Sequence, residues 1–141
     1  MAGWRVGMVL GSATHIGHIL RVKSNMDSGM FYGIQKGAIA ALGLGKDWFD
    51  HINGIYAQRR ALVFKLVETL GCSYDSNQVG LFVWAKLPSG IDAEAFIDKV
   101  LLEKYIFITP GTIFGTMGAG YIRFSLCVKE EQIKEAIERV K

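Results

Sequence analysis

The stretch YIRFSLC, residues 121–127, decides the fold together with the glycine-rich segment GTIFGTMGAG that precedes it at residues 111–120. Apolar side chains in 121–127 alternate with a period of two, which is typical of a strand with one buried face. The apolar face consists of Ile122, Phe124 and Leu126. The glycines before the strand predict a loop whose backbone can bend beside a ligand or a neighbouring domain.

Two more strands and two helices are predicted around this segment. Residues 79–87 and 105–109 have the composition of strands, and a Pro-Ser-Gly turn follows the first of them. Asp92 is a suitable N-cap for the next helix. The last helix places apolar residues on one face, at Ile133, Ala136, Ile137 and Val140. These elements predict an α+β fold with a small antiparallel or mixed sheet of about three strands covered by helices.

The N-terminal part has a different pattern. Residues 4–10, WRVGMVL, are predicted to form an apolar strand, for which the later strands offer no evident partner. Ser12 can cap a helix that runs to about residue 23. A second helix is predicted over about residues 28–42, where glycines spaced by four favour tight packing in a soluble core.

A long helix is predicted to connect the two parts of the chain. It starts with Asp47 as N-cap, and Gly71 is placed to end it. Its length suits a helix that bridges two layers or domains. The sequence therefore predicts a strand and helices over residues 1–44, followed by the small-sheet domain over residues 45–141.

Charge and composition argue against several classes of partner. The net charge is only +3, half of the residues are hydrophobic, and about a fifth are charged, which is typical of a soluble globular domain. No nucleic acid partner is expected, because the net charge is small and the basic residues are scattered. No membrane partner is expected either, since no apolar run approaches the roughly 18 residues that span a bilayer. The two cysteines, Cys72 and Cys127, have no metal or redox spacing. A cytoplasmic location is therefore expected.

Arg123 is the first candidate binding residue. It shares a strand face with Tyr121 and Ser125, beside the glycine-rich loop. A guanidinium on a rigid strand can hold a carboxylate through two parallel hydrogen bonds. An arginine that simply faces solvent is the alternative interpretation of this pattern.

Arg5 is the second candidate. The alternation of residues 4–10 places it beside Gly7, which leaves space for a bulky anion such as a phosphate. A structural salt bridge is the alternative. Other sites are not expected, because the glycine-rich loop lacks the GxxxxGK[ST] pattern of a phosphate loop. His15 and His18 lack a third metal ligand, and no serine or cysteine has the context of a nucleophile.

Three motifs, taken together, resemble a known family. MAGWRVG at residues 1–7, SNMDSGMFYGIQKGAIAAL at 24–42 and PGTIFGTMGAGYIRFSLC at 110–127 resemble segments of class I/II, fold-type-I aminotransferases that depend on pyridoxal phosphate. The motifs occur in the family's order over nearly the whole chain. Among subfamilies, NMDSGMF at residues 25–31 most resembles the aspartate, methionine and LL-diaminopimelate aminotransferase-like enzymes.

The resemblance implies roles for individual residues. Arg5 matches the arginine that binds the cofactor phosphate, and Arg123 matches the one that binds the α-carboxylate of the substrate. Residues 27–31 match a segment near the dimer interface and active site. Residues 1–44 would then belong to the large, cofactor-binding domain and residues 45–141 to the C-terminal small domain. The full-length enzyme is expected to be a homodimer that uses an amino acid and a 2-oxo acid.

Three family features have no match in these residues: the Schiff-base lysine, the aspartate that pairs with the pyridine nitrogen and the aromatic residue that stacks on the cofactor ring. The resemblance places the Schiff-base lysine a few residues before Met1, and none of the lysines present stands in the expected Ser-Lys context. The chain alone is therefore expected to be inactive and to hold no pyridoxal phosphate. Two alternatives stay open: a non-enzymatic module that binds amino acids or 2-oxo acids, and a purely structural fragment that could dimerise by exchanging the strand at residues 4–10.

Overall fold

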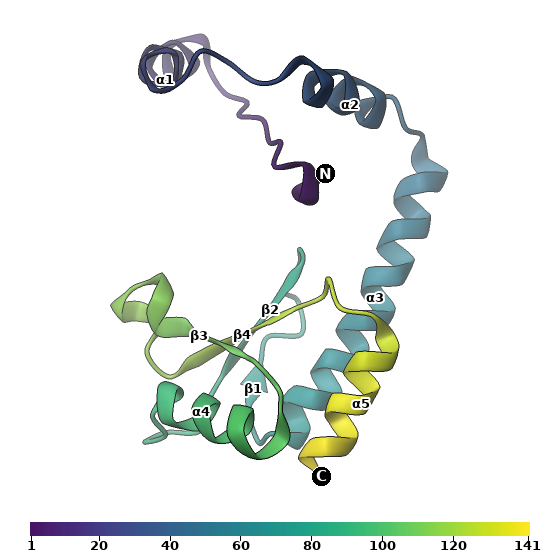
Figure 1. The fold of residues 1–141 in the computed structure, drawn as a ribbon, viewed down its shortest axis with the longest axis vertical. Coiled ribbons are helices and arrows are strands. Elements are labelled where there is room, and N and C mark those ends of the chain that lie inside the picture. The colour runs from purple at the N-terminus through teal and green to yellow at the C-terminus, as the bar shows by residue number, and fades with distance from the viewer. The chain divides into compact units, whose positions relative to one another are not determined.

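The computed structural model describes residues 1–141, apart from the side chain of Ala2. It divides into two compact units, Met1–Phe49 and Asp50–Lys141 (Figure 1). Among the described residues, no helix combines the length and the apolar character needed to cross a membrane.

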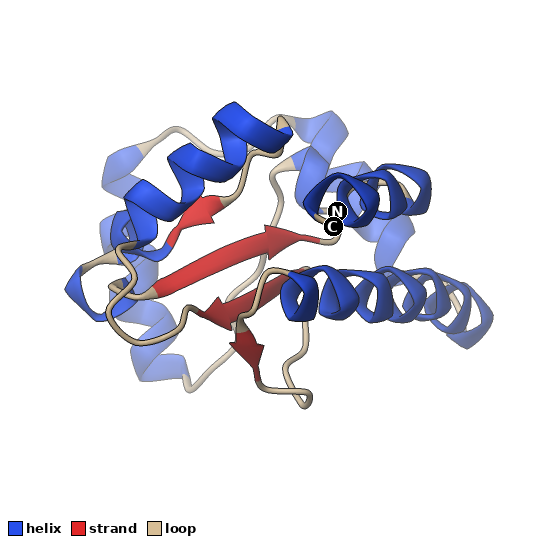
Figure 2. Cartoon of the chain, turned by 90° about the horizontal axis from the view of Figure 1, so that it is seen from below, coloured by secondary structure: helices blue, strands red, loops and turns tan.

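The second unit contains a four-stranded sheet, shown in red in Figure 2. Along the chain the strands are β1 (Ser73–Tyr74), β2 (Phe82–Lys86), β3 (Thr109–Pro110) and β4 (Tyr121–Ser125). Their spatial order is β1-β2-β4-β3, and every neighbouring pair is antiparallel. The strand that carries Arg123, β4, is therefore an inner strand with a partner on each side.

Three helices pack with this sheet: α3 (Lys46–Thr69), α4 (Ala93–Lys104) and α5 (Glu130–Val140). Asp92 caps α4 as predicted, since its carboxylate accepts a hydrogen bond of 2.8 Å from the backbone N–H of Ala95. The long helix α3 begins one residue before its predicted cap. It ends at Thr69, and Gly71 follows two residues later in the left-handed conformation, with φ +73°.

The core lies between the helices and one face of the sheet. Strand alternation sends Val83 and Ala85 of β2 and Ile122 and Phe124 of β4 to that face, and Ile122 is completely buried. The helices contribute the following buried side chains: Val63, Leu66 and Val67 from α3, Ala93, Ile97 and Val100 from α4, and Ile133 from α5. The predicted α+β fold with a small helix-covered sheet is confirmed, with four strands instead of about three.

The first unit has helices but, over its described side chains, no buried core. It consists of the 3₁₀ turn η1 (Ala2–Trp4) and the helices α1 (Ala13–Met26) and α2 (Tyr32–Leu42). Of the side chains that the structure describes in residues 1–49, none is buried. Two glycines of α2 lie against aromatic rings: an added Cβ would lie 2.5 Å from the ring of Phe31 at Gly33 and 3.1 Å from the ring of Trp4 at Gly37.

The predicted strand at residues 4–10 is wrong. The chain there forms the end of η1, a turn at Arg5 and then irregular backbone. A strand needs hydrogen bonds to a neighbour, and within the described part of the chain no strand pairs with this segment. Arg5 also has φ 55°, which breaks the extended conformation.

Other differences are smaller. Gly29 precedes α2 and turns the chain there, with φ +111°, so it does not extend the glycine-marked face of the helix. The strand predicted over residues 105–109 is reduced to β3, Thr109–Pro110. β1 was not predicted, because a two-residue strand has no periodicity to recognise.

Candidate functional site

Arg123 occupies a fixed position in the middle of the sheet. Its Cα pairs with Trp84 of β2 on one side and with Thr109 of β3 on the other. Its neighbours in sequence, Ile122 and Phe124, point into the core and are buried. The backbone that carries the guanidinium is therefore anchored by two ladders and by packing, which is the rigidity predicted from the alternation of residues 121–127.

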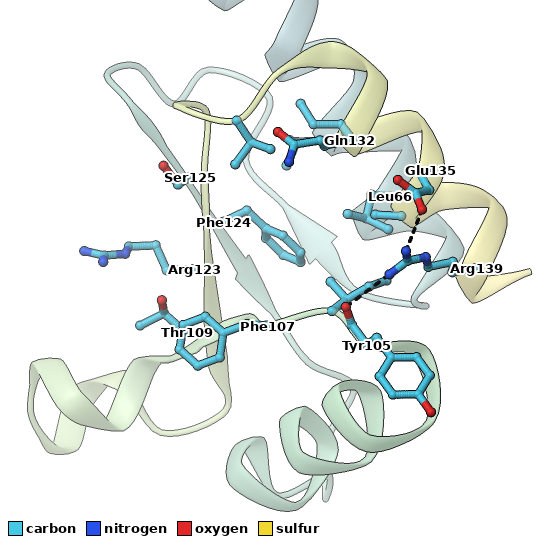
Figure 3. A pocket seen from close by; sticks show the side chains of 15 residues that line it. Leu66, Tyr105, Phe107, Thr109, Arg123, Phe124, Ser125, Gln132, Glu135 and Arg139 are labelled. Atoms are coloured by element: carbon cyan, nitrogen blue, oxygen red, sulfur yellow. Dashed lines mark hydrogen bonds and ion pairs between the residues drawn. The ribbon is translucent and has the colours of Figure 1, made fainter.

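The side chain of Arg123 extends from the face opposite the core. Figure 3 shows Arg123 and Ser125 on one side of β4 and Phe124 on the other. Two aromatic rings contact the guanidinium, whose central carbon lies 4.2 Å from the ring centroid of Phe82 and 4.4 Å from that of Phe114. A cation over an aromatic face is attracted by the ring quadrupole.

The hydrogen-bonding groups of this guanidinium are unused. Among the residues that the structure describes, no carboxylate and no carbonyl accepts a hydrogen bond from Arg123. An arginine side chain presents five N–H donors in a planar fork that matches a carboxylate. The alternative of an arginine lying free in solvent does not describe it, because it is half-buried and held between rings.

Aromatic rings surround the guanidinium on this face of the sheet. Trp84 stacks on Tyr121 with ring centroids 5.4 Å apart, and its edge meets the ring of Phe114 at 5.8 Å. Sequence reasoning did not select Phe82 or Phe114 as site residues. The position of Phe82 depends on the pairing of the strands. Phe82 lies on the same face of β2 as Trp84, and Trp84 is the residue that pairs with Arg123.

The glycine-rich loop carries Phe114 to the site. The loop contains two 3₁₀ turns, η2 (Gly111–Phe114) and η3 (Thr116–Gly118). Gly111 and Gly118 are buried and touch each other, so that a Cβ on either one would overlap the carbonyl oxygen of the other. The glycines therefore let two segments of the loop pack closely on each other. The sequence predicted a bend beside a ligand or a neighbouring domain, and this contact within the loop was not foreseen.

A separate cavity of about 510 Å³ lies on the helix side of β4. Arg123 belongs to its wall, but its side chain points away from Phe124 and the helices (Figure 3). The other two charged side chains of the cavity satisfy each other, since Arg139 pairs with Glu135 at 2.5 Å and also donates to the carbonyl of Tyr105 at 3.3 Å. Because Arg123 has free N–H donors, the face of the sheet from which its side chain extends is a better candidate site than this cavity.

Arg5 lies in the first unit, and Arg123 lies in the second. Its side chain is exposed, and within the described residues no acceptor engages it. A Cβ added at Gly3 or Gly7 would meet nothing within 4 Å, so the neighbouring backbone leaves open space. Its left-handed φ of 55° costs about 1 kcal/mol in a non-glycine residue, an outlier that is typical of functional positions.

The remaining candidates do not form sites. Over the described residues, no three His, Cys, Asp or Glu side chains gather as metal ligands would. His15 contributes to the start of α1, where its ring nitrogen lies 3.0 Å from the hydroxyl of the cap residue Ser12. Cys72 is buried, and burial raises the pKa of its thiol, which disfavours the reactive thiolate.

Comparisons with known proteins match the whole chain. The family model of aminotransferase class I and II matches residues 1–140. The LL-diaminopimelate aminotransferase of Nitratidesulfovibrio vulgaris is 39% identical over 140 residues, which are 99% of this chain and 36% of that protein. The same enzyme of Halothermothrix orenii is 40% identical over 141 residues, covering 100% of this chain and 36% of that protein.

A solved structure agrees with these matches. An aminotransferase from Staphylococcus aureus superposes with a TM-score of 0.81 at 28% identity, over 99% of this chain and 37% of that one. This chain thus spans about 36% of the length of the curated relatives it matches. A family match over nearly every residue, with the same fold, leads to one conclusion: the chain belongs to the class I and II aminotransferase family.

Proposed function

We propose that this chain supplies the carboxylate-binding part of an enzyme that transfers an amino group between an amino acid and a 2-oxo acid with pyridoxal phosphate. The observation that supports this most strongly is Arg123, whose unpaired guanidinium is held by rings on an inner strand. Two parallel hydrogen bonds to the α-carboxylate would fix both position and orientation of the substrate. Fixing the substrate in this way favours a reactive alignment at its α-carbon.

The cofactor's phosphate has a matching group in Arg5. That guanidinium is exposed and unpaired within the described residues, and the flanking glycines leave room around it. Its donor set fits a phosphate, so Arg5 is proposed to hold this end of the cofactor. When bound, pyridoxal phosphate supplies the electron sink of the reaction. In the same proposal, residues 1–44 belong to the cofactor-binding domain and residues 45–141 to the small domain.

The chain alone is proposed to be inactive. None of its lysines stands in the Ser-Lys context of the family's cofactor-bearing lysine. The full-length enzyme is proposed to be a cytoplasmic homodimer, with residues 27–31 near the interface. Because the relatives are LL-diaminopimelate aminotransferases, LL-diaminopimelate is the first amino donor to test in a full-length form.

Titration of the purified chain with 2-oxoglutarate tests the role of Arg123. We expect saturable binding, monitored by the NMR signals of the arginine Nε–H groups, and about tenfold weaker binding in Arg123→Lys, because lysine loses the bidentate fork. Arg21→Lys, on the exposed surface of α1, is the matched control and should bind as the unaltered chain does. Equal affinities in Arg123→Lys and the unaltered chain would refute this role.

Pyridoxal phosphate and borohydride test the inactivity of the chain alone. We expect no stoichiometric lysine adduct by mass spectrometry and no amino transfer from glutamate. A single labelled lysine would contradict this part of the proposal. Binding of 2-oxoglutarate without cofactor would favour the second candidate function, an amino-acid or 2-oxo-acid binding module, since Arg123 and both rings lie within one compact unit.

A further inference from the structure

Three separate parts of the second unit converge on one side chain. Arg123 comes from β4, Phe82 begins β2, and Phe114 ends the 3₁₀ turn η2. Both rings lie close to the guanidinium carbon, at 4.2 and 4.4 Å. Among the ring pairs of the described residues, Phe82 and Phe114 do not pack on each other, so they reach the guanidinium from different directions.

The register of the sheet places Phe82. Arg123 pairs with Trp84, and Phe82 lies two residues earlier on the same strand face. Diagonal neighbours of this kind are within reach of aromatic and long side chains. Phe82 is still 42% exposed, so its ring covers the arginine without being part of the hydrophobic core.

The glycine contact places Phe114. Gly111 and Gly118 touch through their backbones, and a Cβ at Gly111 would also come within 3.0 Å of the Trp84 ring. Immediately after Phe114, Gly115 turns the chain with φ +114°. Phe114 is thereby held near the sheet face, where its ring meets both Trp84 and the guanidinium of Arg123.

We propose that Phe82 and Phe114 are positioning residues that hold the Arg123 guanidinium so that its N–H edge receives a carboxylate. This inference rests on the proposed function of Arg123. The rings occupy the space over the guanidinium and restrict its rotation, while its in-plane donors stay free. A side chain ordered before binding loses less conformational entropy when the ligand arrives, so the rings raise affinity without touching the carboxylate.

The ligand-free chain gives the first test. Rings over a guanidinium displace the NMR signals of its Nε–H and Cδ–H protons through their ring currents and slow its rotation. Phe82→Leu and Phe114→Leu keep an apolar side chain but remove the ring, so each should move the Arg123 signals and speed the rotation. Phe114→Tyr should restore both, and Phe107→Leu, an exposed phenylalanine without a ring contact to Arg123, is the matched control.

Carboxylate affinity gives the second test. Phe82→Leu and Phe114→Leu should weaken the binding of 2-oxoglutarate about threefold to tenfold, and Phe114→Tyr should recover it. Unchanged Arg123 signals in both leucine variants would overturn the positioning role, whatever the affinity. Failure of the unaltered chain to bind through Arg123 would instead overturn the proposed function, so the two failures are distinguishable.

Discussion

Residues 1–49 and residues 50–141 are both rich in apolar side chains, yet they use them differently. Among the described side chains, the buried hydrophobic ones lie in the second unit, around the face of the sheet that the helices cover. In the first unit, Leu10, Met26 and Phe31 are 82%, 74% and 76% exposed. The two regions thus differ in how many of their apolar side chains are buried, although both contain many such residues.

The difference teaches that a core needs opposing apolar surfaces as well as apolar residues. In the second unit a sheet and three helices each bury one face against the others. The helices α1 and α2 have apolar residues but, over the described side chains, no buried one. Such a surface is typical of an interaction face, and it agrees with our proposal that residues 1–44 belong to a larger domain.

The largest predicted effect compares one isoleucine in each region. Ile122 of β4 is completely buried, and Ile39 of α2 is 63% exposed. Ile122→Ala should lower the free energy of unfolding by about 3 kcal/mol, because it removes buried methyl groups and leaves a cavity. Ile39→Ala should change it by less than about 0.5 kcal/mol.

Urea unfolding followed by circular dichroism measures both variants, with the midpoint and slope compared to those of the unaltered chain. The ratio of the two effects is the decisive quantity. Equal losses would mean that residues 1–49 share in the cooperative core, and the distinction between the regions would be wrong.

Two glycines give the next largest contrast. Gly118→Ala would force a Cβ against the carbonyl oxygen of Gly111, and such overpacking should cost about 2 kcal/mol. Gly17, inside α1, has nothing within 4 Å of an added Cβ. Gly17→Ala should therefore stabilise α1 by about 1 kcal/mol, since alanine favours helix. The helical content and the urea midpoint of each variant test these opposite signs, and a tolerated Gly118→Ala would refute the close backbone contact.

Much of the second unit could be predicted from the sequence, because its periodicities are local. The alternation around Arg123 predicted β4 and its buried face, and Asp92 marked the start of α4. The segment at residues 4–10 has the same alternation, yet it forms no strand. Alternation shows which faces differ, but a strand also needs a partner whose position the local sequence does not specify.

The candidate site was predictable in part for the same reason. Arg123 could be selected from its own strand and from the family motif. Its contacts with Phe82 and Phe114 depend on the register between β2 and β4 and on the contact between Gly111 and Gly118. Those are tertiary features, so the two rings became candidates only in three dimensions.

The helix caps give a smaller contrast between the regions. Asp92 caps α4 with a 2.8 Å hydrogen bond, and Ser12 caps α1 with a longer one of 3.4 Å to the N–H of His15. Asp92→Ala should lower the global free energy of unfolding by about 1 kcal/mol, because α4 packs into the core. Ser12→Ala should leave the urea midpoint unchanged and reduce only the helical content of α1. Hydrogen exchange at the N-terminal amides of each helix measures the local effect, and a shifted midpoint in Ser12→Ala would contradict it.

The smallest predicted effect concerns two carboxylates whose pKa values are both lowered. A hydrogen bond from Arg59 lowers the pKa of Glu130, and a hydrogen bond from Lys23 lowers the pKa of Asp27. A carboxyl whose pKa is lower in the folded than in the unfolded chain stabilises the fold above its unfolded pKa. That contribution is lost as the pH falls through the folded pKa.

The same acid titration should have different consequences in the two regions. Arg59 of α3 also donates to the carbonyl of Leu126 at 3.2 Å, so its two bonds connect α3 to the residue that follows β4 and to the start of α5. The pair of Lys23 and Asp27 lies within about one turn at the end of α1, with both side chains about half exposed. Unfolding free energies between about pH 7 and about pH 3 should therefore fall less steeply in Glu130→Gln than in the unaltered chain, while Asp27→Asn should follow the unaltered curve. A Glu130→Gln curve that runs parallel to that of the unaltered chain would show that this ion pair is not coupled to the core, because a pair that joins packed elements must transmit its titration to the global unfolding equilibrium.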